Sequence, residues 1–357
     1  MSFDPKQEDY LRLGVELMRE NFPTRDFQHF DKALEEFFTT FQTNPDTLPN
    51  SDENRAFHLV SQATVLLDYT LPFSPLDQAS DLLDRALALL KQATLLDDHC
   101  FDAQRMLAIY SHRDFESYYQ YLKEREPEVK AWCLEHKAKK IKNLPIPELQ
   151  GIVGSLAMRP YWRWAYALAT KAAICGRYTI AKKHVLELLD MDSEDGAGAH
   201  QTGYLVAAKL EDSWLLSRMD FLNQRPGYRD SQRFTAWKAI GAMALAFKSC
   251  DFKEAESQLA FLLRHFDHSA LALTRLEEVP DGVFCRMNIK PGSENELILA
   301  LSEASILFQE GFGLEDQGAL GTWVANHPMV VEQLGEDELF DTLFAEDLEL
   351  SDFEEES

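Results

Sequence analysis

The chain has 357 residues, 45% of them apolar, so it can bury a sizeable core and wholesale disorder is excluded. Its 16 glycines and 14 prolines are too few for a turn-dense β-protein. The formal net charge is −25, but residues 291–357 hold 18 acidic and no basic side chains, which leaves a net charge of only −7 on residues 1–290. Because nucleic-acid-binding proteins usually present a basic surface, we expect no nucleic-acid partner.

Apolar residues recur at helical spacing along most of the chain. Residues 56–69, 78–96 and 256–266 each repeat the i, i+3, i+4, i+7 pattern of an amphipathic helix. The pattern breaks at short polar or proline-containing stretches, such as residues 44–46 and 145–147. No window of the sequence alternates cleanly with the period of a strand. The sequence therefore predicts an all-α protein with essentially no sheet.

Two predicted helix pairs share a turn that is followed by a small residue. In residues 163–195 the turn lies at Gly176, and Ala181 follows where the two helices would touch. Residues 251–259 repeat this arrangement with Ala255. Ala181 and Ala255 lie 74 positions apart, which equals two units of 37 residues. Further units are predicted at residues 10–45, 56–97, 102–130 and 197–230.

This spacing resembles that of the tetratricopeptide (TPR) family, whose 34-residue units read W-x2-L-G-x2-Y, then A-x3-F, then P. The residues that carry the resemblance are Tyr10, Leu13, Gly14, Ala33, Phe37, Pro45, Leu168, Ala169, Gly176, Tyr178, Ala181, Ala255 and Leu259. The resemblance covers about residues 5–270 and implies a right-handed superhelix (an α-solenoid) of irregular TPR-like helix pairs. The signature tryptophan and most terminal prolines are missing, so irregular repeats are expected.

A narrower resemblance covers about residues 145–325. Residues 159–198 are similar to the repeat core of uncharacterised bacterial TPR-like proteins, some of which occur beside metal-binding SEC-C motifs. The segments that usually follow this core are matched at residues 280–281, 292–296 and 319–323. No SEC-C cysteine motif is present, so the resemblance implies neither a metal nor a cofactor.

The patterns divide the chain into three parts. N-terminal helical repeats are predicted over residues 1–143, and C-terminal repeats with a capping region over residues 144–328. The acidic tail, residues 329–357, holds 12 acidic and no basic side chains, yet apolar residues recur in it at helical spacing. Such a mixture suits a short amphipathic helix that docks onto a groove, and a tail without specific contacts is the alternative.

Motifs of nucleophilic, metal-dependent and phosphate-binding catalysis are missing, including G-x-S-x-G, H-E-x-x-H and the P-loop. Residues 190–201 begin like a calcium loop, but position 6 is Asp195 and position 12 is Gln201, so we interpret them as a turn between repeats. Cys133 and His136 lack the two further ligands that a structural zinc needs. We predict no catalytic residue, no metal and no cofactor.

The five cysteines lie far apart and are odd in number, which argues against a disulfide framework and fits a reducing compartment. The N-terminus lacks the basic and apolar segments that are typical of a signal peptide. No stretch approaches the ~18 uninterrupted apolar residues of a membrane-spanning helix. We therefore expect a cytoplasmic protein without membrane association.

Aromatic and basic residues gather in residues 159–170 and recur two units later. In this repeat class the first helix of each unit lines the concave face, where arginine and aromatic side chains can contact a peptide. The candidate peptide-binding residues are Arg159, Trp162, Arg163, Tyr166, Thr170, Trp237 and Lys238. The alternative for the aromatic residues is packing between repeats, since large aromatic side chains dominate protein cores.

The sequence thus favours a scaffold or adaptor that binds a protein or peptide partner on the concave surface of the repeats. The alternative is an enzyme or small-molecule sensor with a pocket between the two helical halves. A nucleic-acid mimic is a third hypothesis, and the concentration of acidic residues in the tail argues against it.

Overall fold

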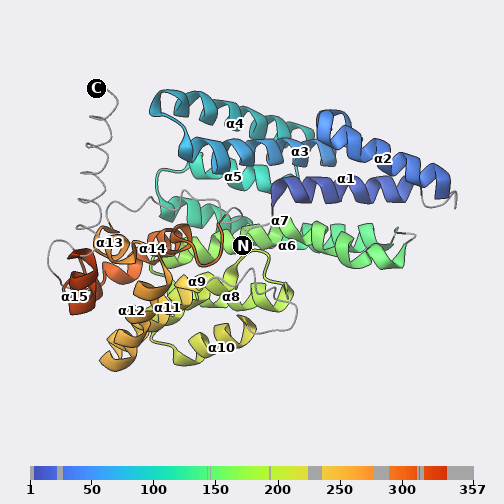
Figure 1. Cartoon of the computed structure of the whole chain (residues 1–357). Coiled ribbons are helices and arrows are strands. Elements are labelled where there is room, and N and C mark those ends of the chain that lie inside the picture. The colour runs from blue at the N-terminus through green and yellow to red at the C-terminus, as the bar shows by residue number, and fades with distance from the viewer. Residues whose placement is uncertain are drawn as a thin grey trace, which may run out of the picture. The chain divides into compact units, whose positions relative to one another are not determined.

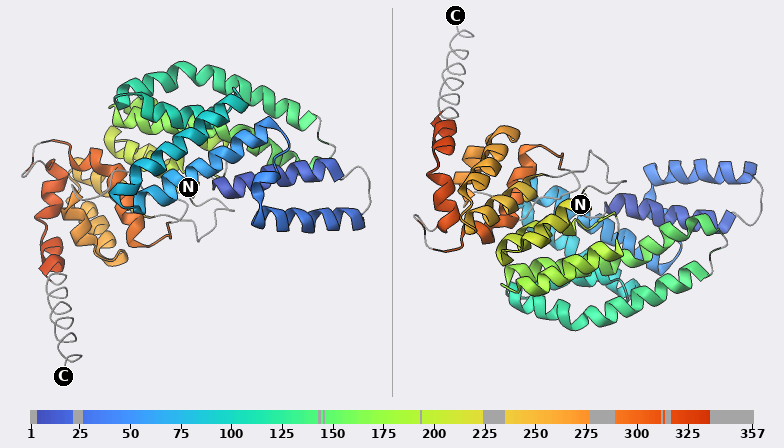
Figure 2. Two further views of the ribbon diagram at one scale, coloured as in Figure 1. Left: turned by 90° about the horizontal axis from the view of Figure 1, so that it is seen from above. Right: turned by 90° about the horizontal axis from the view of Figure 1, so that it is seen from below.

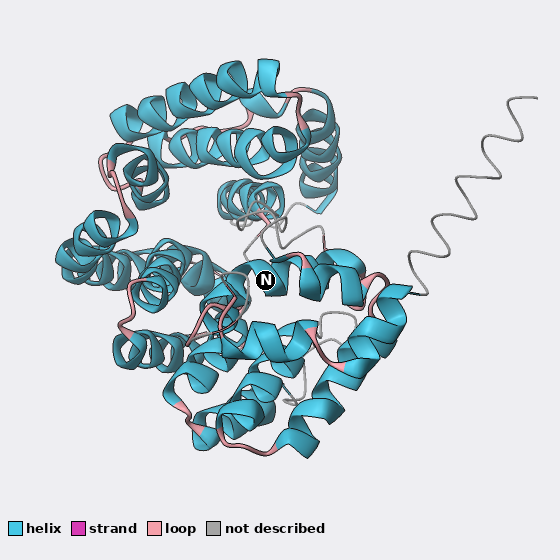
Figure 3. Ribbon diagram, turned by 90° about the vertical axis from the view of Figure 1, so that its left-hand side faces the viewer, coloured by secondary structure: helices cyan, strands magenta, loops and turns pink. Residues whose placement is uncertain are grey.

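The computed structural model describes residues 4–21, 27–142, 144, 146–192, 194–223, 235–276, 289–311, 313 and 317–335. Helices dominate these residues and none of them forms a strand (Figure 1, Figure 3). The all-α prediction is therefore confirmed. Among the described residues, a boundary between Ala199 and His200 separates two compact units. In the described part of the chain, no helix combines the length and apolar character needed to cross a membrane.

The first unit is built from long helices joined by short turns. Its helices are α1 (Pro5–Asn21), α2 (Phe27–Thr43), α3 (Asp52–Thr64), α4 (Leu76–Leu96), α5 (Phe101–Ser111), α6 (Phe115–Lys142), α7 (Gln150–Ile174) and α8 (Tyr178–Met191). A π-helical turn, Val65–Thr70, extends α3, and a 3-10 turn at Pro45–Thr47 follows α2. Long helices of this unit pair closely, and α6 and α7 lie side by side in both views of Figure 2.

The predicted apolar faces of α3 and α4 form a core with α5. Val60 and Leu67 from the first face pack with Ala86 and Leu90 from the second, and Met106 of α5 completes the cluster. All five side chains are buried. The helical spacing in the sequence therefore identifies the residues that hold these helices together.

The second unit contains shorter helices. They are α9 (which begins at the boundary, Ala199–Leu210), α10 (Ser213–Asn223), α11 (Ala236–Lys248), α12 (Phe252–His265), α13 (Ser269–Thr274), α14 (Glu294–Phe308) and α15 (Ala319–Ala325). Helix α11 packs against α12 and α14. At Gly241 of α11, an added Cβ would lie 2.8 Å from the carbonyl oxygen of Tyr204 in α9, so only glycine permits this close approach.

Three helix pairs end their first helix in the same way. Gly176, Glu211 and Cys250 follow α7, α9 and α11 with φ angles of 73°, 53° and 61°, in the left-handed region. The N–H of Arg177 then donates to the carbonyl of Ala172 at 2.7 Å, and the corresponding bonds after the other two turns are both 2.9 Å. This is the Schellman ending of a helix. The turns at 176 and 251 lie where the sequence predicts them, and one helix pair, α9 and α10, lies between them. Residues 224–230 of the predicted unit 197–230 lie outside the described residues.

The two alanines predicted at the close contacts are completely buried. Ala181 lies in α8, which packs against α7, and Ala255 lies in α12, which packs against α11. The predicted burial of both residues is confirmed. Side chains larger than alanine would therefore push these paired helices apart.

The structure places the boundary between its compact units later than the sequence analysis does. Helices α6 and α7, on either side of the expected boundary at residues 143–144, belong to the same unit. Trp164 of α7 is completely buried, and its Nε1–H donates to the carbonyl of Leu122 in α6 at 2.9 Å. The segment at residues 143–149 therefore joins two packed helices.

The structure also bears on the predicted turn after α8 and on the predicted start of α14. Asp192 accepts hydrogen bonds from backbone N–H groups in the turn after α8, as expected for a turn between repeats. Ser293 caps α14 by accepting from the N–H of Glu296, at the predicted helix start. Most of the expected acidic tail, from residue 336 onward, lies outside the described residues.

Candidate functional site

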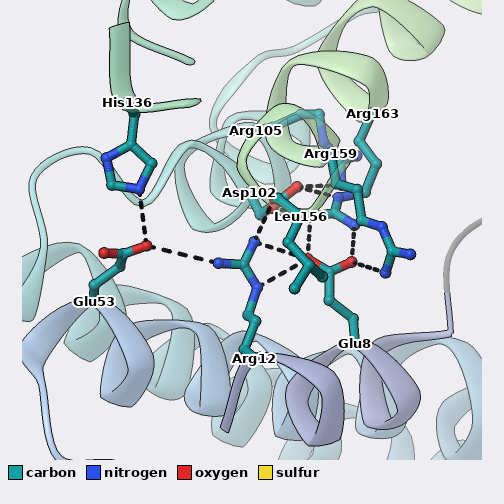
Figure 4. A network of polar contacts seen from close by, with 9 residues as sticks. All are labelled: Glu8, Arg12, Glu53, Asp102, Arg105, His136, Leu156, Arg159 and Arg163. Atoms are coloured by element: carbon teal, nitrogen blue, oxygen red, sulfur yellow. Dashed lines mark hydrogen bonds and ion pairs between the residues drawn. The ribbon is translucent and has the colours of Figure 1, made fainter. Parts of the chain in front are cut away.

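Arg159 and Arg163 lie one turn apart on α7 and point toward α1 and α5 (Figure 4). Arg163 Nη1 donates to Glu8 Oε2 at 2.8 Å, and its Nε donates to Asp102 Oδ1 at 2.6 Å. Arg159 Nη1 also donates to Glu8 Oε2, at 3.2 Å. Both arginines are therefore engaged with carboxylates of their own unit.

The helix irregularity at Pro160 contributes to the same network. Proline has no N–H, so the carbonyl of Leu156, four residues earlier, lacks its usual partner within α7. Arg12 of α1 donates to this carbonyl at 3.1 Å (Figure 4). Arg12 also donates to Glu8 Oε1 at 2.8 Å, so the proline in α7 creates an additional contact with α1.

Glu8 is the centre of this network. Its side chain is completely buried, and burial alone would raise its pKa. The positive charges of Arg163, Arg12 and Arg159 outweigh burial and lower the pKa of Glu8 to about 2. Glu8 is therefore ionised at neutral pH and neutralises part of the positive charge of α7.

A second carboxylate extends the network to α3 and α6. Glu53 lies 3.1 Å from His136 Nε2, 2.9 Å from Lys140 Nζ and 3.8 Å from Arg12 Nη1. Burial opposes ionisation of Glu53, but the hydrogen bond with His136 and the positive charges of Lys140 and Arg12 hold its pKa well below the usual range. The polar network thus connects α1, α3, α5, α6 and α7, which is a structural role for these charges.

The five predicted peptide-binding residues of α7 do not form one exposed patch. Arg159 and Arg163 are turned into the polar network, and Trp162 is buried. Tyr166 is partly exposed, and the hydroxyl of Thr170 donates to the carbonyl of Tyr166 at 3.2 Å. The side chains of Arg159, Trp162 and Arg163 point inward because α7 packs between other helices of the unit.

The other two predicted residues belong to the second unit. The Nε1–H of Trp237, a buried side chain, donates to Glu303 Oε2 at 2.8 Å. The side chain of Lys238 is partly exposed, and its Nζ lies 3.2 Å from Asp220 Oδ1. Within this unit, packing accounts for Trp237 and ion pairing accounts for Lys238.

A cleft of about 830 Å³ lies among α1, α2, α3 and α4 in the first unit. Apolar side chains of Phe41, Leu66 and Leu89 line it, together with the amides of Gln62 and Gln92. The π-helical turn after α3 contributes to its wall, and such widened turns occur often at functional sites. The cleft can therefore accept apolar groups and also hydrogen-bond to polar ones.

His58 holds one end of this cleft in place. Its Nδ1 lies 2.6 Å from Asp9 Oδ2 and its Nε2 lies 2.9 Å from Asp46 Oδ1. Gln62 Nε2 donates to the same Asp46 oxygen at 2.8 Å. Burial lowers the pKa of His58, but the two aspartates outweigh burial and raise it. A protonated His58 donates to both carboxylates and links α1, α3 and the turn after α2.

No sequence motif points to this cleft. Asp9, Asp46 and His58 come from three separate segments, and none of them belongs to a recognisable motif. The one available signal was His58 itself, a polar residue directly after Phe57 within the apolar pattern of residues 56–69. A histidine in that position indicates a buried polar contact without identifying its partner.

Comparison with known proteins adds no relative. The chain matches no family model, and it is similar to no curated protein and to no solved structure.

Proposed function

We propose that this chain is a TPR-like repeat protein whose helix pairs stack into a right-handed superhelix and bind a peptide segment of a partner protein. Three helix pairs with the same left-handed turn support the repeat assignment. The small buried residues that follow two of these turns support it further. Stacked helix pairs provide extended binding surfaces because each pair buries its apolar face against its neighbours.

We assign peptide binding to the cleft among α1 to α4 in place of the α7 residues. The observation that carries this assignment is the cleft's mixed lining, in which apolar side chains lie beside glutamine amides. A volume of about 830 Å³ accommodates several side chains of a short segment. The best-suited ligand is a short peptide with apolar anchors and polar groups between them.

The test begins with selection of peptides from a displayed random library on the full chain. Ala88 is exposed on α4 and lines the cleft, so Ala88→Trp should obstruct binding with little effect on folding. Leu95→Trp is the matched control, because Leu95 is 87% exposed on the same helix and lies outside the cleft lining. We expect Ala88→Trp to lower the affinity for the selected peptides by at least about tenfold, as measured by fluorescence anisotropy.

Equal affinities for the wild-type chain and for Ala88→Trp would exclude the cleft as the peptide site. Failure to select any peptide that binds saturably would contradict the proposed function itself. A loss of affinity in Leu95→Trp as large as in Ala88→Trp would indicate a general effect of added tryptophan on α4.

A further inference from the structure

Two glutamates and a histidine converge from α6 and α8 of the first unit. Glu126 belongs to α6, while His184 and Glu187 are three residues apart on α8 and so share one face of that helix. His184 Nδ1 lies 3.9 Å from Glu126 Oε1 and 3.8 Å from Glu187 Oε2. One ligand atom from each of the three residues lies within 4.8 Å of the other two.

The buried nitrogen of His184 makes this cluster different from an ordinary ion pair. Only 6% of the His184 side chain is exposed, and Nδ1 has no hydrogen-bond partner among the described residues. Buried polar atoms in proteins are nearly always satisfied, because an unsatisfied one costs on the order of 1–3 kcal/mol. The two carboxylate oxygens that face Nδ1 are too distant to accept a hydrogen bond from it.

The carboxylate of Glu126 is oriented by a neighbouring helix. The hydroxyl of Tyr161 in α7 donates to Glu126 Oε1 at 3.1 Å. Hydrogen bonds of this kind orient metal-binding carboxylates in known sites. Glu187 is 35% exposed and its other oxygen lies 3.8 Å from the largely exposed Lys183, so the cluster has a path to solvent.

We propose that Glu126, His184 and Glu187 bind a divalent transition-metal ion. One imidazole nitrogen and two carboxylates are ligands that Zn²⁺ and similar ions accept, and their two negative charges match a divalent cation. Ligands bound at about 2.1 Å lie at most about 4.2 Å apart, so small side-chain rotations would bring all three onto one ion. The ion would also satisfy the buried nitrogen of His184.

The protonation state of His184 agrees with this assignment. Burial lowers the pKa of His184, the two glutamates oppose that effect, and the net result is a lowered pKa. The imidazole is therefore neutral at pH 7, which is the form that binds a metal. The proposal is independent of peptide binding, because the cleft and this cluster share no residue.

The test is titration of the metal-free full chain with Zn²⁺ and with Co²⁺, followed by calorimetry and by visible absorption respectively. We expect one ion per chain and a Co²⁺ spectrum without the intense bands of thiolate ligands. Glu187→Gln should weaken binding of both ions by at least about tenfold, and its partly exposed position makes a folding defect unimportant. Tyr161→Phe removes only the orienting hydroxyl and should weaken binding by about tenfold.

Two control variants test the location of the bound ion. Asp97, Asp98 and His99 are another group of potential metal ligands among the described residues. If the ion binds at Glu126, His184 and Glu187, Asp98→Asn should leave the affinity for the metal unchanged. Cys250 is an exposed free thiol, and Cys250→Ser should also have no effect. The proposal is overturned if the wild-type chain shows no saturable binding, or if Glu187→Gln binds both ions as tightly as the wild-type chain.

Discussion

Glu8 and Asp9 are neighbours in α1, yet they belong to two different polar regions of the first unit. Glu8 faces α7 and accepts hydrogen bonds from Arg12, Arg159 and Arg163. Asp9 lies about a quarter turn away along the helix and pairs with His58 at the cleft. The first region is closed and internally paired, whereas the second borders an open cleft.

The two regions thus differ in how their polar residues are paired and in how far solvent can reach them, although both contain charged residues. Arg159 and Arg163, predicted from the sequence to bind a peptide, hold helices together in the structure. The cleft, by contrast, has a mixed lining of aliphatic, glutamine and charged side chains that form no sequence motif. Substitutions in the two regions should therefore change the stability of the protein by different amounts and through different interactions.

The largest effect is expected in the closed network. Glu8→Gln removes the central negative charge and leaves buried arginines without their shared partner. Loss of one member of a buried ion pair typically costs about 3–5 kcal/mol. Urea denaturation should show a decrease of this size in the free energy of unfolding. Glu36→Gln, at an exposed pair with Lys32, is the control and should change it very little.

A somewhat smaller effect is expected where the helix pairs touch. Ala181→Trp and Ala255→Trp would each overpack a completely buried contact and should cost about 1–3 kcal/mol. Ala138→Trp, at an exposed position of α6, is the control. Thermal denaturation of the three variants would test the repeat assignment, and unchanged melting temperatures for both buried variants would contradict it.

The all-α class and several helix faces and turns were predictable because their signals are local. Helical spacing identified the faces that carry Val60 and Leu90, and the turns before Ala181 and Ala255 were visible as small residues at fixed spacing. The sites were not predictable because their residues are distant in sequence. Glu8 and Arg163 lie 155 positions apart, and nothing in either segment specifies the other.

The same limit applies to the cluster proposed to bind a metal. His184 and Glu187 have a spacing suited to one helix face, but Glu126 lies on another helix with no motif around it. No metal was expected from the sequence because its potential ligands match no known motif. Only the packing of α6 against the other helices of the unit brings the third ligand into place.

The smallest effect concerns the pH dependence of the open region. The pKa of His58 is raised in the folded protein, so protonated His58 stabilises the fold. This stabilisation is complete below the unfolded-state pKa of about 6.5 and is lost as the pH rises through the higher folded-state pKa. The free energy of unfolding should therefore fall by an amount on the order of 1 kcal/mol or less, because solvent screens the partly exposed pair with Asp46.

His58→Gln is the variant that isolates this contribution, since glutamine can hydrogen-bond to an aspartate but does not titrate. Urea denaturation of the wild-type chain and of the variant should be compared from pH 6 upward. We expect the stability difference between them to shrink as the pH rises, while the wild-type chain retains the larger dependence. A constant difference across the range would mean that the pKa of His58 is the same in the folded and the unfolded protein, so that the two aspartates do not favour its protonated form.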